Sequence, residues 1–257
     1  MDFQIALLLG QDGLTNGAIY ALLALALVLV FAVTRVIFIP QGEFVAYGAL
    51  TLAMLQAGKL PATLWMIAAL GAAIVVIDGA IAIRHGAARR LPRIVLSNLG
   101  VPLALLFIVP NINAAGLPLV AQIALTLAVV VPLGPMIYRL AYQPIAEAPV
   151  LILLIVSVAV HVVLIGLGLL FFGAEGTRTP AFTDGTLDLG VTTLQYQTLW
   201  ILAISAVLIV ALYAFFGRTL YGKALRATAL NRTGARLMGI STTMAGKLSF
   251  TLAAMIG

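Results

Sequence analysis

The chain has 257 residues, of which 63% are hydrophobic and only 9% are charged, and its mean hydropathy is +1.18. An average soluble domain carries about 25% charged residues, so this composition excludes a water-soluble globular protein and indicates a lipid environment. The formal charge of +6 does not indicate a nucleic-acid partner, because the Lys and Arg residues stand at the ends of apolar runs. The lack of Cys in the sequence excludes disulfides, thiolate chemistry and Cys-based zinc sites.

Seven charge-poor segments approach the length that a membrane-crossing helix requires, about 20 residues that rise about 1.5 Å each. In chain order these segments are Gly13–Thr34, Val36–Ala57, Thr63–Ile83, Ile94–Val109, Leu117–Tyr138, Pro149–Phe172 and Leu194–Phe216. An eighth apolar segment, Met244–Gly257, is too short to cross, so we expect a chain truncated within its last span. The pattern predicts an all-α polytopic membrane helical bundle, with one transmembrane domain over residues 1–257.

Charged residues divide the predicted loops into two groups. Residues 84–93 contain four Arg and no acid, and residues 218–247 contain six Lys or Arg and no acid. The loop at 173–193 instead carries three acids against one Arg. Since cytoplasmic loops retain Lys and Arg, we expect both basic loops inside the cell, and alternation then places the acidic loop and the N-terminus outside.

The segment Gly217–Lys223 fits the G-x-x-x-x-G-K pattern of a phosphate-binding P-loop. A P-loop also needs a preceding strand, a following Ser or Thr for Mg²⁺, and a soluble α/β core. Here an apolar span precedes the glycine and Ala224 follows the lysine, so we interpret the match as chance. The residues that follow predict a basic helical segment with Gly239 as its C-terminal cap. Such a segment either lies on anionic headgroups or docks a partner protein.

Two longer stretches carry a resemblance to a known family. Gly13–Phe44 contains a G-L-x-x-G-x-x-Y-A-L opening and the Gly42-Glu43 pair of an H-G-E element, with Gln41 in place of the usual His. Arg226–Ile240 resembles a cytoplasmic E-A-A-x-x-x-G loop that falls here on Thr233, Gly234, Ala235 and Gly239. Thr233 and Gly234 replace the usual Glu and Ala. Together with YRLAYQPI (138–145) and LLFFG (169–173), these motifs resemble ABC-importer permeases of the branched-chain amino-acid type (the hydrophobic amino-acid uptake family).

The resemblance covers residues 13–55 and 136–257 and is weak over 85–135. It implies a permease subunit of a bacterial-type inner membrane that is not an enzyme and holds no cofactor itself. Separate ATPase subunits would bind and hydrolyse ATP, beside a second permease subunit and a periplasmic substrate-binding protein. It also implies transport of branched-chain or related amino acids, with urea, short amides or aromatic acids as alternatives.

The same resemblance makes residues 218–242 the cytoplasmic loop that couples the permease to its ATPase. The small residues Gly234, Ala235 and Gly239 would permit close backbone approach there. The basic residues would attract an acidic rim of the partner, and these are Arg226, Arg232 and Arg236. Thr233 removes the carboxylate that is usual at its position.

Polar residues within the predicted spans are candidates for a substrate path, since charge in a membrane is costly and usually functional. Glu43 lies beside Gln41 and Gly42, just after Pro40 interrupts the helix. Its carboxylate could hold a substrate ammonium group or pair with Arg35. His161 lies near mid-membrane, where it lines the path or bonds to a neighbouring helix. An ion-coupled secondary transporter is the rival interpretation, although it usually needs several intramembrane carboxylates.

Overall fold

The computed structural model describes residues 3–174, 177, 179–183, 185–188 and 193–257. Three charged residues of the acidic loop, Glu175, Arg178 and Asp184, lie outside the described residues. The helices are α1 (Phe3–Thr34), α2 (Gln41–Gln56), α3 (Thr63–Arg84), η1 (Ala88–Arg90), α4 (Leu91–Asn111), η2 (Ala114–Gly116), α5 (Leu119–Val130), α6 (Leu133–Ile137), the π-helical turn η3 (Tyr138–Tyr142), η4 (Gln143–Ile145), α7 (Val150–Phe172), α8 (Tyr196–Arg218), α9 (Leu220–Leu230), α10 (Arg232–Leu237) and α11 (Thr242–Ile256). The strands β1 (Thr186–Asp188) and β2 (Thr193–Gln195) form an antiparallel hairpin before α8.

The all-α membrane fold is confirmed. In the described part of the chain six helical segments are long and apolar enough to cross a membrane. They are Ile5–Thr34, Thr63–Arg84, Ala88–Asn111, Leu119–Ile145, Val150–Phe172 and Tyr196–Arg218.

The second of the seven predicted spans, Val36–Ala57, is interrupted at Pro40, as the sequence predicts, and it is not among the six long apolar helices. Its helical part, α2, has 16 residues and begins only at Gln41. Pro40 has no backbone N–H and disfavours helical geometry in the residue before it, so residues 35–38 are not helical and residues 39–40 form a turn. At about 1.5 Å per residue, the 16 residues of α2 reach about 24 Å. A bilayer core is about 30 Å thick, so α2 by itself is shorter than a full crossing.

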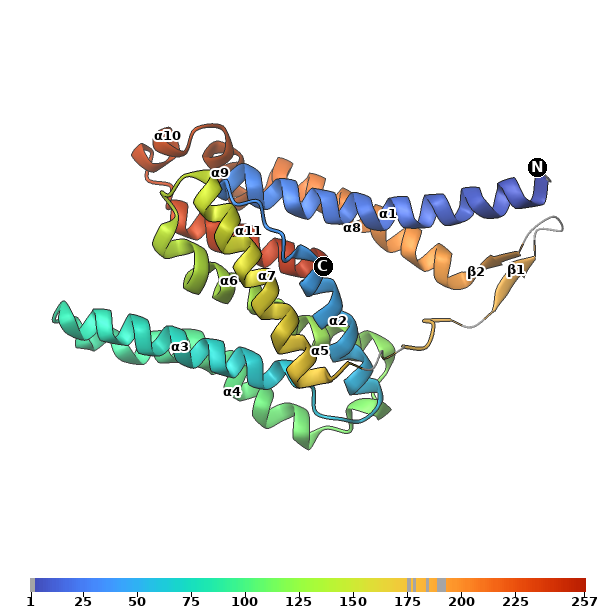
Figure 1. The fold of residues 1–257 in the computed structure, drawn as a ribbon, viewed down its shortest axis with the longest axis horizontal. Coiled ribbons are helices and arrows are strands. Elements are labelled where there is room, and N and C mark those ends of the chain that lie inside the picture. Colours follow the sequence, from blue (N-terminus) through green and yellow to red (C-terminus); the bar gives the residue numbers. More distant parts are fainter. Residues whose placement is uncertain (1–2, 175–176, 178, 184, 189–192) are drawn as a thin grey trace.

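The basic loops lie at one end of the molecule and the hairpin of the acidic loop lies at the other, as the sequence predicts (Figure 1). The α3–α4 connection, which holds the basic residues 84–93, lies at the same end as α9 and α10. The N-terminal end of α1 and the β1–β2 hairpin lie at the opposite end. In between, α3 packs along α4 on one flank and α1 packs along α8 on the other, with α2, α6, α7 and α11 between the two flanks.

An aromatic cluster holds the central elements together. Its five side chains are at most 2% exposed, and its ring centroids lie 4.8–6.0 Å apart. The members are Phe38, Phe44, Tyr138, Tyr142 and Phe250. These side chains come from the residues before α2, from α2 itself, from η3 and from α11, so their burial fixes the start of α2 against the C-terminal part of the chain.

Glycines bring the backbones of these central elements close together. A Cβ on Gly134 of α6 would collide with the carbonyl oxygen of Phe250 in α11. A Cβ on Gly246 of α11 would collide with the phenol end of the Tyr138 side chain. The close approach of α11 to α6 and η3 therefore depends on these two positions having no side chain.

Candidate functional site

The break between α1 and α2 forms the centre of the first candidate site. Arg35 adopts a left-handed backbone conformation with φ of 61°, and buried and exposed residues then alternate up to Pro40, as in a strand. Other elements satisfy the polar groups of the break: the Ile39 N–H donates to Ser157 Oγ of α7 at 3.0 Å. The Gln41 side-chain Nε2 donates to the Ala253 carbonyl of α11 at 2.9 Å. These bonds let an irregular backbone lie inside a membrane bundle.

Glu43 and His161, both predicted from the sequence as substrate-path candidates, meet at this break. Glu43 is in the first turn of α2 and His161 is near the middle of α7. Glu43 Oε1 lies 2.7 Å from His161 Nδ1, and the two side chains are 12% and 34% exposed. Among the described residues, neither His161 Nδ1 nor Glu43 Oε2 has an aligned hydrogen-bond partner. The contact is therefore a short side-chain contact that leaves the second carboxylate oxygen of Glu43 without a hydrogen-bond partner among the described residues.

The other two predicted path residues take different positions. Gln41 is buried and supports α2 through α11, whereas Gly42 is exposed. Glu43 contacts His161 rather than Arg35. The sequence did not indicate Ser157, whose hydroxyl also accepts a hydrogen bond from Tyr142 at 3.3 Å. A serine in an apolar helix is a weak signal, because its partner backbone comes from a distant segment.

Two capped helices, α9 and α10, build the second candidate site, the segment 218–242. The Gly222 N–H donates to Thr219 Oγ1 at 2.9 Å at the start of α9, and the Gly234 N–H donates to Asn231 Oδ1 at 2.8 Å at the start of α10. Gly239, with φ of 83°, ends α10, and the amides of residues 239 and 240 bond back to Arg236 and Ala235. The predicted cap at Gly239 is confirmed. Gly217 lies in the last turn of α8 rather than after a strand, and Gly222 has no room for a side chain against Phe215, so the P-loop match reflects helix packing.

Two of the predicted coupling arginines bind their own chain. Arg232 Nη1 donates to the Ala146 carbonyl at 3.0 Å. Both terminal nitrogens of Arg236 contact Glu147 Oε1, at 3.1 and 3.0 Å. These contacts hold α10 against the turn that precedes α7. Of the remaining predicted residues, Arg226, Thr233 and Gly239 are exposed, Gly234 is half-buried beside Asn231, and Ala235 is buried.

The most exposed part of this segment is apolar, which the sequence reading missed. Leu230, Leu237 and Met238 are 89%, 83% and 84% exposed. We call these three side chains the coupling surface. The sequence motif drew attention to charged and small residues, several of which are also exposed, but the aliphatic side chains are the most exposed of the segment.

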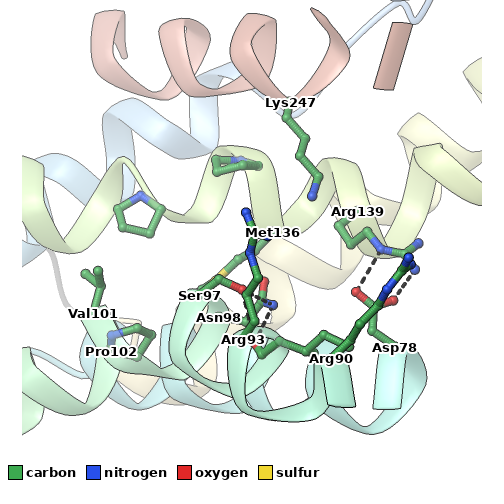
Figure 2. Close-up of a pocket in the computed structure, with 13 residues that line it drawn as sticks. Asp78, Arg90, Arg93, Ser97, Asn98, Val101, Pro102, Met136, Arg139 and Lys247 are labelled. Atoms are coloured by element: carbon green, nitrogen blue, oxygen red, sulfur yellow. Dashed lines mark hydrogen bonds and ion pairs between the residues drawn. The ribbon is translucent and has the colours of Figure 1, made fainter. Parts of the chain in front are cut away.

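An intramembrane ion pair links α3 to the segment after α6. Asp78 accepts hydrogen bonds from two nitrogens of Arg139, and both side chains are about one-fifth exposed (Figure 2). The pair joins the α3–α4 hairpin to the central elements. Among the described residues, no group of three or more His, Cys, Asp or Glu could hold a metal ion.

A family model described as the permease component of a branched-chain amino acid transport system matches residues 62–257. The chain belongs to this family. The match includes residues 85–135, where the motifs are weak, and begins downstream of Gly13–Phe44. Comparisons with curated proteins and with solved structures gave no match. The permease is accordingly a multi-pass membrane protein with a role in transport.

Proposed function

We propose that this permease is the membrane-spanning subunit of an ATP-binding-cassette importer for branched-chain or related amino acids. Its partners are separate ATPase subunits that bind the ATP, a second permease subunit and an external substrate-binding protein, and it resides in a bacterial-type inner membrane. The family match over residues 62–257 carries the proposal. The gathering of both basic loops at one end supports a cytoplasmic position for that end and an external N-terminus.

The coupling surface is the proposed docking site for the ATPase. Leu230, Leu237 and Met238 are more than 80% exposed beyond the end of α8, and burial of each would contribute about 1.5–3 kcal/mol. Arg226 and Thr233 lie exposed on the same segment and extend the docking face. Since Arg232 and Arg236 fasten α10 to residues 146 and 147, a displacement of α10 would be passed to α7. Helix α7 carries His161, so a movement of the docked ATPase would reach the substrate path through α10 and α7.

The break before α2 is the proposed substrate path. The free oxygen of Glu43 suits the ammonium group of an amino acid, and His161 holds the carboxylate in position. The N-terminus of α2 carries a partial positive charge that suits the substrate carboxylate. Gln41 and Gly42 support the path: Gln41 fixes the helix start, and Gly42 leaves its surface open. Urea, short amides and aromatic acids are the alternative substrates.

Copurification tests the docking proposal. The permease is expressed together with a candidate ABC-importer ATPase from its own genome, and recovery of the ATPase is compared for the native chain, Leu237→Glu/Met238→Glu and Lys223→Gln. We expect the double variant to lose most of the ATPase. The control should retain it, since Lys223 is exposed on α9 outside the coupling surface. Absence of any ATPase on the intact chain would refute the importer assignment.

The Glu43–His161 pair also favours a second candidate, an ion-coupled secondary transporter, because such pairs occur in proton relays. Uptake into vesicles separates the two. Uptake that needs ATP and survives an uncoupler supports the importer, whereas uptake that needs no ATPase and stops with the uncoupler supports the secondary transporter.

A further inference from the structure

A cavity of about 610 Å³ opens between the α3–α4 hairpin, the segment from Pro132 to Arg139, and α11 (Figure 2). Its position places it at the end of the molecule that carries the basic loops, because Arg90 and Arg93 stand at the start of α4. Neither the coupling surface nor the Glu43–His161 pair borders it.

The charge lining this cavity is strongly positive. Four cationic side chains and one carboxylate face it, and these are Arg90, Arg93, Arg139, Lys247 and Asp78. Arg139 already engages the carboxylate. No carboxylate of the described residues lies within 4.0 Å of the three other cations. They point toward the cavity from two elements, α4 with its preceding turn and α11, and Ser97 and Asn98 add polar groups beside them.

The opposite side of the cavity is apolar. Val101 and Pro102 line it there. At about 1.5 Å per residue, Val101 lies about 12 Å further along α4 than Arg93, toward the middle of the membrane. Val101 is itself half-exposed, and its neighbour Leu103 faces outward, so this side opens to the surroundings of the bundle. The cavity therefore changes from cationic to apolar along α4.

We propose that this cavity binds an anionic phospholipid, with its phosphate among Arg90, Arg93 and Lys247 and the start of an acyl chain along Val101 and Pro102. A phosphate-bearing anion explains the cationic side, and basic pockets between helices at the cytoplasmic side are suited to such headgroups. A free phosphate would match that side but would leave the apolar side without a role. The lipid would bridge the α3–α4 hairpin and α11, which border the cavity from opposite sides.

Native mass spectrometry of the purified full chain in detergent tests this proposal, with phosphatidylglycerol and phosphatidylcholine as probes. We expect retention of phosphatidylglycerol but little phosphatidylcholine, and a loss of affinity of about five-fold for each basic residue neutralised. The variants are Arg90→Gln/Arg93→Gln and Lys247→Gln. Arg89→Gln is the matched control, since Arg89 lies in the same turn but does not line the cavity.

Three results would overturn the proposal. The first is equal retention of the two lipids, and the second is an equal loss of lipid affinity in the Arg89→Gln control. The third is displacement of the bound lipid by inorganic phosphate at an equal concentration, which would assign the site to a free anion. The charge-preserving variants Arg93→Lys and Lys247→Arg should bind as the native chain does, and a matching melting temperature without lipid shows that each variant is folded.

Discussion

Replacement of Gly246 by alanine tests how α11 is held against the rest of the bundle. The new methyl group would collide with the phenol end of Tyr138, a side chain that is 2% exposed and packs on Phe250 with ring centroids 5.1 Å apart. Either the buried Tyr138 side chain shifts or α11 moves away from η3. Overpacking of this kind costs about 1–3 kcal/mol.

Gly166 of α7 is a matched control, because none of the described atoms lies within 4 Å of a Cβ built there. Both substitutions add a methyl group inside a helix and gain about the same helix propensity, about 1 kcal/mol. That gain cancels when the two variants are compared. The difference between them therefore isolates the collision with Tyr138, and we expect Gly246→Ala to be about 1–3 kcal/mol less stable than Gly166→Ala.

The assay is equilibrium unfolding in detergent micelles, followed by circular dichroism as the denaturant is increased. The double variant Gly246→Ala/Tyr138→Leu adds a test of the cause, since removal of the ring should recover part of the lost stability. Equal unfolding free energies for Gly246→Ala and Gly166→Ala would refute the reasoning, as would a double variant whose losses simply add.

Three further predictions concern the other contacts. Glu43→Gln should lower the initial rate of amino-acid uptake into vesicles at least ten-fold. Gly48→Ala on the same helix should keep this rate within about two-fold of the native rate. Equal uptake rates for the two variants would show that Glu43 does not belong to the substrate path. Arg139→Gln should destabilise the bundle by about 2–3 kcal/mol in the unfolding assay, because it leaves the mostly buried Asp78 without its partner. The double variant Asp78→Asn/Arg139→Gln should lose less stability than Arg139→Gln alone. A larger loss in the double variant would contradict this reasoning. Gly239→Ala should lower the local stability of α10 by about 1–2 kcal/mol, since the φ of Gly239 is 83°. It should therefore speed hydrogen exchange over residues 232–238. The control Gly217→Ala, in α8, should leave that exchange unchanged.

The glycines show where sequence reading stops. Gly17, Gly48, Gly166 and Gly168 in the apolar runs are natural candidates for close helix packing. At Gly17 and Gly166 no described atom lies within 4 Å of a Cβ built there, so neither glycine makes a close contact within this chain. The close approaches occur instead at Gly71, Gly134, Gly222 and Gly246. A glycine at a contact and a glycine facing lipid look alike in a sequence.

The arginines of the segment 218–242 show the same limit of a sequence pattern for charged residues. Arg232 and Arg236 read as free basic residues, yet they bind the turn at residues 146 and 147. Their exposure depended on a segment about ninety positions earlier in the chain, which no local pattern reveals.

By itself the sequence determined the solvent of this permease, its helical class, its family motifs, the separation of its charged loops and the cap at Gly239. These follow from hydropathy, charge and backbone preference, which act over a few neighbouring residues. Only the tertiary structure decided that Glu43 meets His161, that Arg139 pairs with Asp78, and that aliphatic residues form the coupling surface. Those outcomes depend on which helices pack together, and packing joins residues that are far apart along the chain.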